Sequence, residues 1–341
     1  MMYYVTWGGD MPIWLSAMLI ILLALVIDAT IGDPPNRIHP LRWMGNMVGW
    51  FDRHISRTSP GRTKFKGFLS YLAVTLIFMT VAVFILALVR FYLGEIAWII
   101  VSALFLKMTF AIFSFRKHCR PIETDLRNGD TDAAADKTQM IVSRNTKGMD
   151  APHISSSCVE TVAENFADSV CSPLFFSGFF GLIGSTVFRT TNMMDAMWGY
   201  RNEKYGDIGY FPAKFDDVLG YVTSRISIVF IAMSAFLMRM DAGSAIRTAR
   251  AENGKTASPN SGWPMAAVAG AMGITMEKEN VYRIGNGPLP SVDDIGRSYR
   301  LVELASVLFI LLITIPLYVF LGVHVQMFFE NLFIGVLEGL F

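Results

Sequence analysis

Long apolar runs alternate with polar segments along the chain. Four runs are long enough to cross a hydrocarbon core of roughly 30 Å, which takes about 20 helical residues, and they lie at about 12–31, 68–90, 95–115 and 301–323. Two further runs, 174–188 and 226–238, are shorter. The pattern therefore predicts an all-α polytopic membrane protein with about four full transmembrane helices. We expect short re-entrant or buried apolar helices that carry polar motifs within 174–238.

The composition agrees with a membrane protein. Hydrophobic residues make up 53% of the 341 residues, and charged residues make up only 17%. These values are typical of polytopic membrane proteins rather than soluble domains. The formal net charge is only +1 and the sequence has no long basic run, so we expect no nucleic-acid partner. We expect residues 1–341 to form a single integral membrane domain whose partner is the lipid bilayer.

Positive charge predicts the orientation of the chain. Seven Lys or Arg residues lie in each of the polar segments 33–66, 116–172 and 241–300, so all three segments are expected on the cytoplasmic side. The N-terminus is then outside. If both shorter apolar runs spanned the membrane, the polar loop between them would face outward. We therefore expect neither to span fully, so that the motifs cluster on the cytoplasmic face of a multi-pass cell-membrane protein.

Three carboxylates in one short stretch are the first sign of a site. Glu160, Glu164 and Asp168 follow one another at intervals of four residues, with Asn165 beside them. On a helix this spacing places them along one face, where like charges repel each other. A cation is expected there, most plausibly a metal ion that holds a phosphate. An ordinary solvated helix face is the alternative, but the stretch leads into an apolar segment, where carboxylates are more often functional.

Two more acidic motifs follow. Asn192 and Asp195 are three residues apart and share a face if the segment is helical, although a capped interfacial helix explains them equally well. Asp216 and Asp217 are adjacent, so they point in different directions and usually only one of them binds a given ion directly. Mg²⁺ prefers one or two carboxylates together with water and substrate phosphates.

Basic and amide side chains supply candidate phosphate ligands. Arg144, Arg201, Lys214 and Arg225 have the required charge, and each can equally be an anchor on the positive side of the membrane. Asn260 lies in a turn, Asn-Ser-Gly-Trp-Pro, whose backbone amides could bind an anion.

Other familiar kinds of site are missing from the sequence. The three cysteines form no CxxC pair, so we expect them to be reduced and buried, with no disulfide or zinc site. The sequence contains no GxxxxGK[ST] loop and no HExxH motif.

Taken together and in order, these stretches resemble the adenosylcobinamide-phosphate synthase family of cobalamin biosynthesis. The quoted pieces cover most of the chain from 28 to 285, and they are Gly32-Asp33-Pro34-Pro35, His39-Pro40, Leu126-Arg-Asn-Gly129-Asp130, the Glu160–Phe175 stretch, Thr191-Asn192 with Asp195-Ala-Met-Trp-Gly199-Tyr200, Tyr205-Gly206, Asp216-Asp217, Arg225 and Ser258-Pro-Asn-Ser-Gly-Trp-Pro264. No single piece is decisive, but so many in order are specific.

The resemblance implies a membrane enzyme that joins adenosylcobyric acid, a corrinoid, to (R)-1-amino-2-propanol or its O-phosphate. An amide would form at the expense of ATP, with Mg²⁺ clamping the transferred phosphoryl group. Other enzymes of cobalamin assembly are further candidate partners.

The hypothesis gives each motif a role. The candidate catalytic residues are Glu160, Glu164, Asp195, Asp216 and Asp217. The candidate metal ligands are Glu160, Glu164, Asp168 and Asp217. The candidate ligands of substrate or phosphate are Arg144, Asn165, Asn192, Arg201, Arg225 and Asn260.

The chain also departs from the family's pattern. Asn145 follows Arg144 where the family usually has Asp, and Gly220 stands near the paired aspartates where the family commonly has Asn. These departures bear on the ligand set and on the amine substrate.

Two other classes compete with the ligase. A UbiA-type prenyltransferase also holds Mg²⁺ on helix carboxylates, but the spacing of Asn192, Asp195, Asp216 and Asp217 does not fit its aspartate-rich motifs. A small-molecule transporter would need motifs at mid-membrane depth and inverted repeats.

Overall fold

A computed structural model describes residues 11–35, 37–57 and 59–339. The predicted external N-terminus, residues 1–10, lies outside the described residues. The described chain is mainly helical, and its two short strands, β1 (Met276–Lys278) and β2 (Tyr282–Ile284), pair antiparallel. The all-α membrane fold class predicted from the apolar pattern is confirmed.

The helices follow one another closely. The α-helices are α1 (Ile13–Thr30), α2 (Pro40–His54), α3 (Pro60–Lys107), α4 (Ser114–Arg127), α5 (Thr131–Gln139), α6 (Ala151–Asn165), α7 (Ser172–Trp198), α8 (Tyr210–Leu237), α9 (Ala242–Glu252), α10 (Gly262–Met272), α11 (Val292–Phe309), α12 (Ile315–Leu317) and α13 (Val323–Glu338). The π-helices η1 (Phe166–Cys171), η3 (Ile310–Thr314) and η4 (Tyr318–Gly322) join successive α-helices end to end, and η2 (Asn253–Lys255) is a 3₁₀ turn.

Five helical segments in the described chain are long and apolar enough to cross a membrane, which is one more than the expected number of about four. They are Ile13–Thr30, Pro60–Lys107, Ala151–Trp198, Tyr210–Leu237 and Val292–Glu338. The predicted segments 68–90 and 95–115 fall on the two arms of α3, which changes direction at Gly94, where φ is 79°; the second arm ends at Lys107, before the end of the predicted segment.

The two apolar runs within 174–238 belong to helices that also contain the polar motifs beside them. Helix α7 has 27 residues divided by a break at Gly181, and α8 has 28; each continues through polar residues that interrupt the apolar run in the sequence. Asn192 and Asp195 lie within α7, and Asp216 and Asp217 lie within α8. The orientation of these helices in a membrane stays a prediction.

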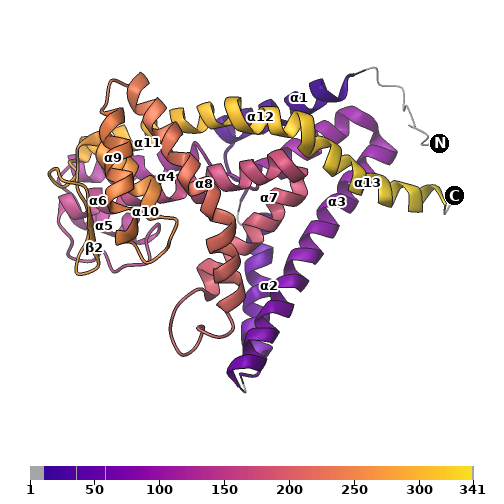
Figure 1. Cartoon of the computed structure of the whole chain (residues 1–341), viewed down its shortest axis with the longest axis horizontal. Coiled ribbons are helices and arrows are strands. Elements are labelled where there is room, and N and C mark those ends of the chain that lie inside the picture. Colours follow the sequence, from indigo (N-terminus) through magenta and orange to yellow (C-terminus); the bar gives the residue numbers. More distant parts are fainter. Residues whose placement is uncertain (1–10, 36, 58, 340–341) are drawn as a thin grey trace. The chain divides into compact units, whose positions relative to one another are not determined.

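The described chain divides into two compact units. Unit 1 contains the described residues within 11–110, 173–216 and 311–339, and unit 2 contains residues 111–172 and 217–310. In unit 1, α2 lies alongside the first part of α3 (Figure 1), and Val48 packs with Tyr71, Val74 and Trp198 in a buried cluster. His39 is the N-cap of α2, and its ring accepts a hydrogen bond from the backbone amide of Leu41.

A break in α7 leaves a backbone amide that is hydrogen-bonded by a side chain from α13. Gly181 has a left-handed φ of 63°, so the helix is interrupted there. The side chain of Gln326 accepts a hydrogen bond from the backbone amide of Leu182 at 3.1 Å. A Cβ at Gly181 would lie 2.5 Å from the Cβ of Gln326, so only glycine permits this approach. The buried amide is satisfied, as an apolar environment requires.

A buried cation ties the start of unit 1 together. Lys107, at the end of α3, is 1% exposed. Its ammonium group lies 2.8 Å from the carboxylate of Asp28 and 2.5 Å from that of Asp33. Because a buried charge is costly unless it is paired, these contacts fix the end of α3 against the end of α1.

Unit 2 packs helices around α6 and α10. Helix α11 contacts both α4 and α6, and the carboxylate of Glu303 accepts from the guanidinium of Arg116. Helix α10 packs closely on α9: a Cβ at Gly270 would lie 2.4 Å from the backbone oxygen of Ser244. The hairpin β1–β2 contacts α6. The expected single integral membrane domain is not tested by this division and stays a prediction.

The hydrogen bond of Gln326 at the break in α7 can be tested by substitution. We expect Gln326→Leu to lower the free energy of unfolding by about 1–3 kcal/mol, since the buried amide of Leu182 would lose its acceptor. Thermal unfolding of the protein in detergent measures this change. His324→Leu, at an exposed position of the same helix, is the matched control and is expected to change stability by no more than about 0.5 kcal/mol. Equal effects of the two substitutions would contradict this account.

Candidate functional site

The buried carboxylate of Glu160 is the centre of a polar cluster in unit 2. Glu160 lies on α6 and is 2% exposed. Its oxygens accept hydrogen bonds from a guanidinium nitrogen of Arg144, from the hydroxyl of Ser156 at 2.7 Å and from the hydroxyl of Tyr282 at 2.6 Å. A carboxylate is tolerated in an apolar interior only when it is paired and hydrogen-bonded in this way. Arg144 supplies a positive charge at Glu160, and the metal ion predicted for the acidic face stays a prediction.

The hairpin brings Tyr282 to this cluster. Its register pairs Glu277 with Arg283, and the backbone amide of Glu277 donates to the hydroxyl of Ser156 at 2.8 Å. On the other side, the carboxylate of Glu252 accepts from the backbone amide of Gly285 at 2.7 Å. Burial raises the pKa of Glu252, but this hydrogen bond and Lys255 outweigh burial and leave the pKa below its ordinary value. The hairpin is thus anchored on both α6 and α9.

The electrostatics of the cluster follow from its burial. Burial raises the pKa of the Tyr282 hydroxyl, and the negative charge of Glu160 raises it further, so Tyr282 is a proton donor at neutral pH. Burial lowers the pKa of Arg144, but its hydrogen bond to Glu160 and the charge of Glu160 raise it by more, and the net direction is upward. The cluster therefore holds a fixed ion pair capped by a neutral phenol.

The other members of the predicted acidic face lie differently. Glu164 lies one helical turn beyond Glu160 with its side chain exposed, and the charge of Glu160 acts on it as well as the opposite charges of Lys278 and Arg144. Asn165 bonds within the helix: it donates to the backbone oxygen of Thr161 and accepts from the Ser169 hydroxyl, both at 2.9 Å.

The continuous α-helix assumed for the acidic face is wrong at its far end. Asp168 belongs to the π-helix η1, whose wider turn changes its register.

A second polar cluster in unit 2 forms around Arg225 on α8. Its guanidinium carbon lies 3.5 Å from the ring centre of Tyr221 and 4.9 Å from that of Trp263. One guanidinium nitrogen donates to the side-chain oxygen of Asn260 at 3.3 Å. The amide nitrogen of Asn260 in turn donates to the backbone oxygen of Asp217 at 2.9 Å. The predicted pair Arg225 and Asn260 is therefore brought together, and Asp217 joins it through its backbone.

Gly220 makes room for this arrangement. A Cβ at position 220 would lie 2.7 Å from the amide nitrogen of Asn260, so a larger residue would push that amide from its place. The departure from the family's pattern at Gly220 thus has a local structural reason. Asn145 accepts from the backbone amide of Lys147 at 3.1 Å and shapes the turn that follows Arg144.

The remaining predicted residues lie in unit 1. The amide of Asn192 on α7 donates to the carboxylate of Asp216 on α8 at 3.3 Å, so this pair is brought together. Asp195 lies close to Gly199, where a Cβ would come 2.1 Å from its carboxylate oxygen. Arg201 and Lys214 are exposed. Apart from Arg201, the predicted site residues therefore fall into three local groups, one each around Glu160, Arg225 and Asn192.

Sequence reasoning missed two members of the Glu160 cluster, Ser156 and Tyr282, and it also missed Lys278, whose charge acts on Glu164. Tyr282 is 122 residues from Glu160, and its three-residue strand leaves no readable pattern. It also missed Lys107 and Asp28, for which a signal existed, because a charge inside an apolar run is expensive and usually paired.

The donor set fits Mg²⁺ only when phosphate supplies the other ligands. Within residues 11–35, 37–57 and 59–339, no group of three His, Cys, Asp or Glu side chains lies close enough to hold a metal ion. Glu160 is already engaged by Arg144. Glu164 and Asp168 offer hard carboxylate oxygens, and Mg²⁺ accepts one or two carboxylates with water and substrate phosphates.

These features define a helical membrane protein with polar clusters built on its long helices. The family model of the CobD/Cbib protein matches residues 21–323. The Cobalamin biosynthesis protein CobD of Dehalococcoides mccartyi is 36% identical over 305 residues, which cover 87% of this chain and 96% of that protein. The chain belongs to the CobD/Cbib family.

Other relatives carry similar names. The Probable cobalamin biosynthesis protein CobD of Thermococcus kodakarensis is 37% identical over 287 residues, covering 84% of this chain and 91% of that protein. The Cobalamin biosynthesis protein CobD of Clostridium perfringens is 31% identical over 290 residues, covering 85% and 91%. No solved structure matches the chain. These names support a role in cobalamin biosynthesis.

The ion pair at Glu160 can be tested by a double-mutant cycle. We expect Arg144→Leu to lower the free energy of unfolding by about 3–5 kcal/mol, because Glu160 would stay buried without its cation. The double variant Arg144→Leu/Glu160→Leu is expected to be more stable than Arg144→Leu alone. Unfolding in detergent measures all four proteins. Additive effects of the two substitutions would show that the pair is not coupled.

Proposed function

We propose that the protein is a ligase that joins adenosylcobyric acid to (R)-1-amino-2-propanol or its O-phosphate at the expense of ATP. The observation that carries this proposal is the exposed Glu164 beside the fixed Glu160–Arg144 pair, within a chain of the CobD/Cbib family. Family membership favours this reaction over the prenyltransferase and the transporter.

Amide formation from a carboxylate requires activation, because a carboxylate is a poor acyl donor. In the proposed reaction a carboxylate oxygen of the corrinoid attacks the γ-phosphorus of ATP, and ADP leaves. The amine nitrogen then attacks the carbonyl carbon of the acyl phosphate. The C–O bond breaks, phosphate leaves with that oxygen, and the amine loses a proton. Positioned charges supply most of the catalysis in such a transfer.

The residues of unit 2 have distinct roles in this proposal. Glu164 and Asp168 would hold Mg²⁺ through their carboxylates, and the metal would neutralise charge on the phosphates. Lys278, which acts electrostatically on Glu164, would contact the same phosphates. Arg144 and Tyr282 keep Glu160 fixed and so hold the hairpin that carries Lys278 in place.

The other two groups of predicted site residues, around Arg225 and Asn192, have the remaining roles. Arg225, fixed between two aromatic rings, would bind a phosphate through the fork of its guanidinium. Asn192 and Asp195 would bind the amine or the side-chain amides of the corrin, and Asn260 would assist Arg225. The cytoplasmic face of a cell membrane remains the proposed location of the reaction.

The activity can be tested directly with protein purified in detergent. Adenosylcobyric acid, ATP and Mg²⁺ are supplied with either aminopropanol or its phosphate, and the corrinoid product is followed by chromatography and mass. We expect an amide product that depends on ATP. We expect Glu164→Gln to lower turnover by about 10²–10³-fold, as removal of one transition-state contact does.

A matched control separates this role from a general effect. Glu203→Gln removes an exposed carboxylate that lies outside all three groups, and it is expected to leave turnover unchanged. Absence of product with either amine would contradict the proposed function. A normal rate in Glu164→Gln would contradict the role of Glu164 while leaving the reaction itself in place.

A further inference from the structure

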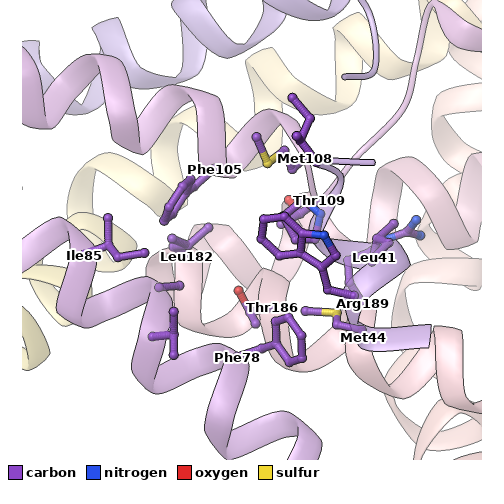
Figure 2. Close-up of a pocket in the computed structure, with 15 residues that line it drawn as sticks. Leu41, Met44, Phe78, Ile85, Phe105, Met108, Thr109, Leu182, Thr186 and Arg189 are labelled. Atoms are coloured by element: carbon purple, nitrogen blue, oxygen red, sulfur yellow. The ribbon is translucent and has the colours of Figure 1, made fainter. Parts of the chain in front are cut away.

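Unit 1 contains an apolar pocket that the proposed reaction does not use. The pocket has a volume of about 290 Å³ and lies between α2, both arms of α3 and α7. Figure 2 shows Ile85, Phe105 and Leu182 on one side of it and Leu41 and Arg189 on the other. Among its fifteen described lining residues, Arg189 is the one charged side chain. The pocket therefore has an apolar end and a cationic end.

The shape and lining do not suit the proposed substrates. A corrin ring with its side chains is far larger than this pocket, and aminopropanol phosphate is too polar for walls made mainly of aliphatic and aromatic carbon. An alkyl chain with an anionic group at one end matches both ends of the pocket.

The surroundings of the pocket identify the source of such a ligand. Its lining helices α3 and α7 belong to segments that are apolar and long enough to span a membrane. Three lining residues, Ile38, Trp43 and Val81, are exposed, so the pocket opens outward where lipid would surround these helices.

The mouth of the pocket carries features of a membrane interface. At the start of α2, exposed Arg37 precedes the lining residues and exposed Arg42 lies among them. The indole nitrogen of Trp43 donates to the backbone oxygen of Arg37 at 3.1 Å, which fixes the ring there. Tryptophan is enriched at membrane interfaces, and basic side chains there attract anionic lipid headgroups.

We propose that this pocket binds an anionic phospholipid, with one acyl chain in the pocket between Ile85, Phe105 and Leu182 and with the phosphate beside Arg189. Arg189 is held at that edge by its hydrogen bond to the side-chain oxygen of Asn192 at 3.5 Å. Asn192 also donates to Asp216 on α8. A bound lipid would therefore contact Arg189, the first of three hydrogen-bonded side chains that end at Asp216. The proposal stands independently of the ligase activity.

Quenching of tryptophan fluorescence tests the proposal. The full-length protein is reconstituted into phosphatidylcholine vesicles that contain either brominated phosphatidylglycerol or brominated phosphatidylcholine. The protein has seven tryptophans, so the signal of Trp43 is taken as the difference between the wild type and Trp43→Phe. We expect brominated phosphatidylglycerol to quench Trp43 with about fivefold higher apparent affinity than brominated phosphatidylcholine, as one arginine at an anionic headgroup provides.

Two variants with matched controls test the binding of the acyl chain and of the headgroup separately. Ala82→Phe fills the pocket and is expected to remove the quenching of Trp43 by either lipid, whereas Leu76→Phe, on an exposed part of α3, is expected to keep it. Arg189→Gln is expected to abolish the preference for phosphatidylglycerol, whereas Arg53→Gln, at the other end of α2, is expected to keep it. Size-exclusion elution confirms that each variant is folded.

The outcomes divide clearly. Preference for phosphatidylglycerol that is lost in folded Arg189→Gln and in folded Ala82→Phe supports the site. Equal quenching by the two lipids would overturn it, because the pocket would then hold an acyl chain without recognising an anionic group. Quenching that is unchanged in Ala82→Phe would also overturn it, since the bromine atoms would be reaching Trp43 from outside the pocket.

Discussion

Charge that is buried must be paired, and this constraint organises the polar part of the molecule. Glu160 is enclosed within unit 2, and its carboxylate is accommodated because Arg144, Ser156 and Tyr282 supply hydrogen bonds and one compensating charge. Tyr282 lies on the hairpin, so the same contacts that satisfy Glu160 also fix the hairpin on α6. The exposed Glu164 and the nearby Lys278 then have defined positions beside a rigid ion pair.

The same constraint acts in unit 1 with the signs exchanged. There a buried cation, Lys107, is paired with Asp28 and Asp33 at the junction of α1 and α3. An uncharged polar group in the helices is also paired. The backbone amide of Leu182, left without a helical partner by the break at Gly181, donates to Gln326. Long apolar helices can carry polar side chains and breaks only where neighbouring elements supply such partners.

Much of the fold could be predicted from the sequence, because apolar runs longer than about 20 residues have few other uses. The lengths of α7 and α8 could not, since Asn192, Asp195, Asp216 and Asp217 interrupt the apolar pattern although the helices continue through them. In the site, spacing predicted that Glu160 and Glu164 share one side of α6. The π-helix that contains Asp168 and the arrival of Tyr282 from a strand 122 residues away depend on tertiary contacts that local spacing does not encode.

The central claim is that the corrinoid carboxylate is activated by phosphorylation before the amide forms, and the path of its oxygen tests this most directly. Adenosylcobyric acid labelled with ¹⁸O at both oxygens of the reacting carboxylate is incubated with the protein, ATP, Mg²⁺ and the amine. Mass spectrometry then follows the label in the released phosphate. The proposed acyl phosphate predicts one ¹⁸O atom in phosphate for each amide formed. Amide formation with no label in phosphate, or with the label in AMP, would contradict it.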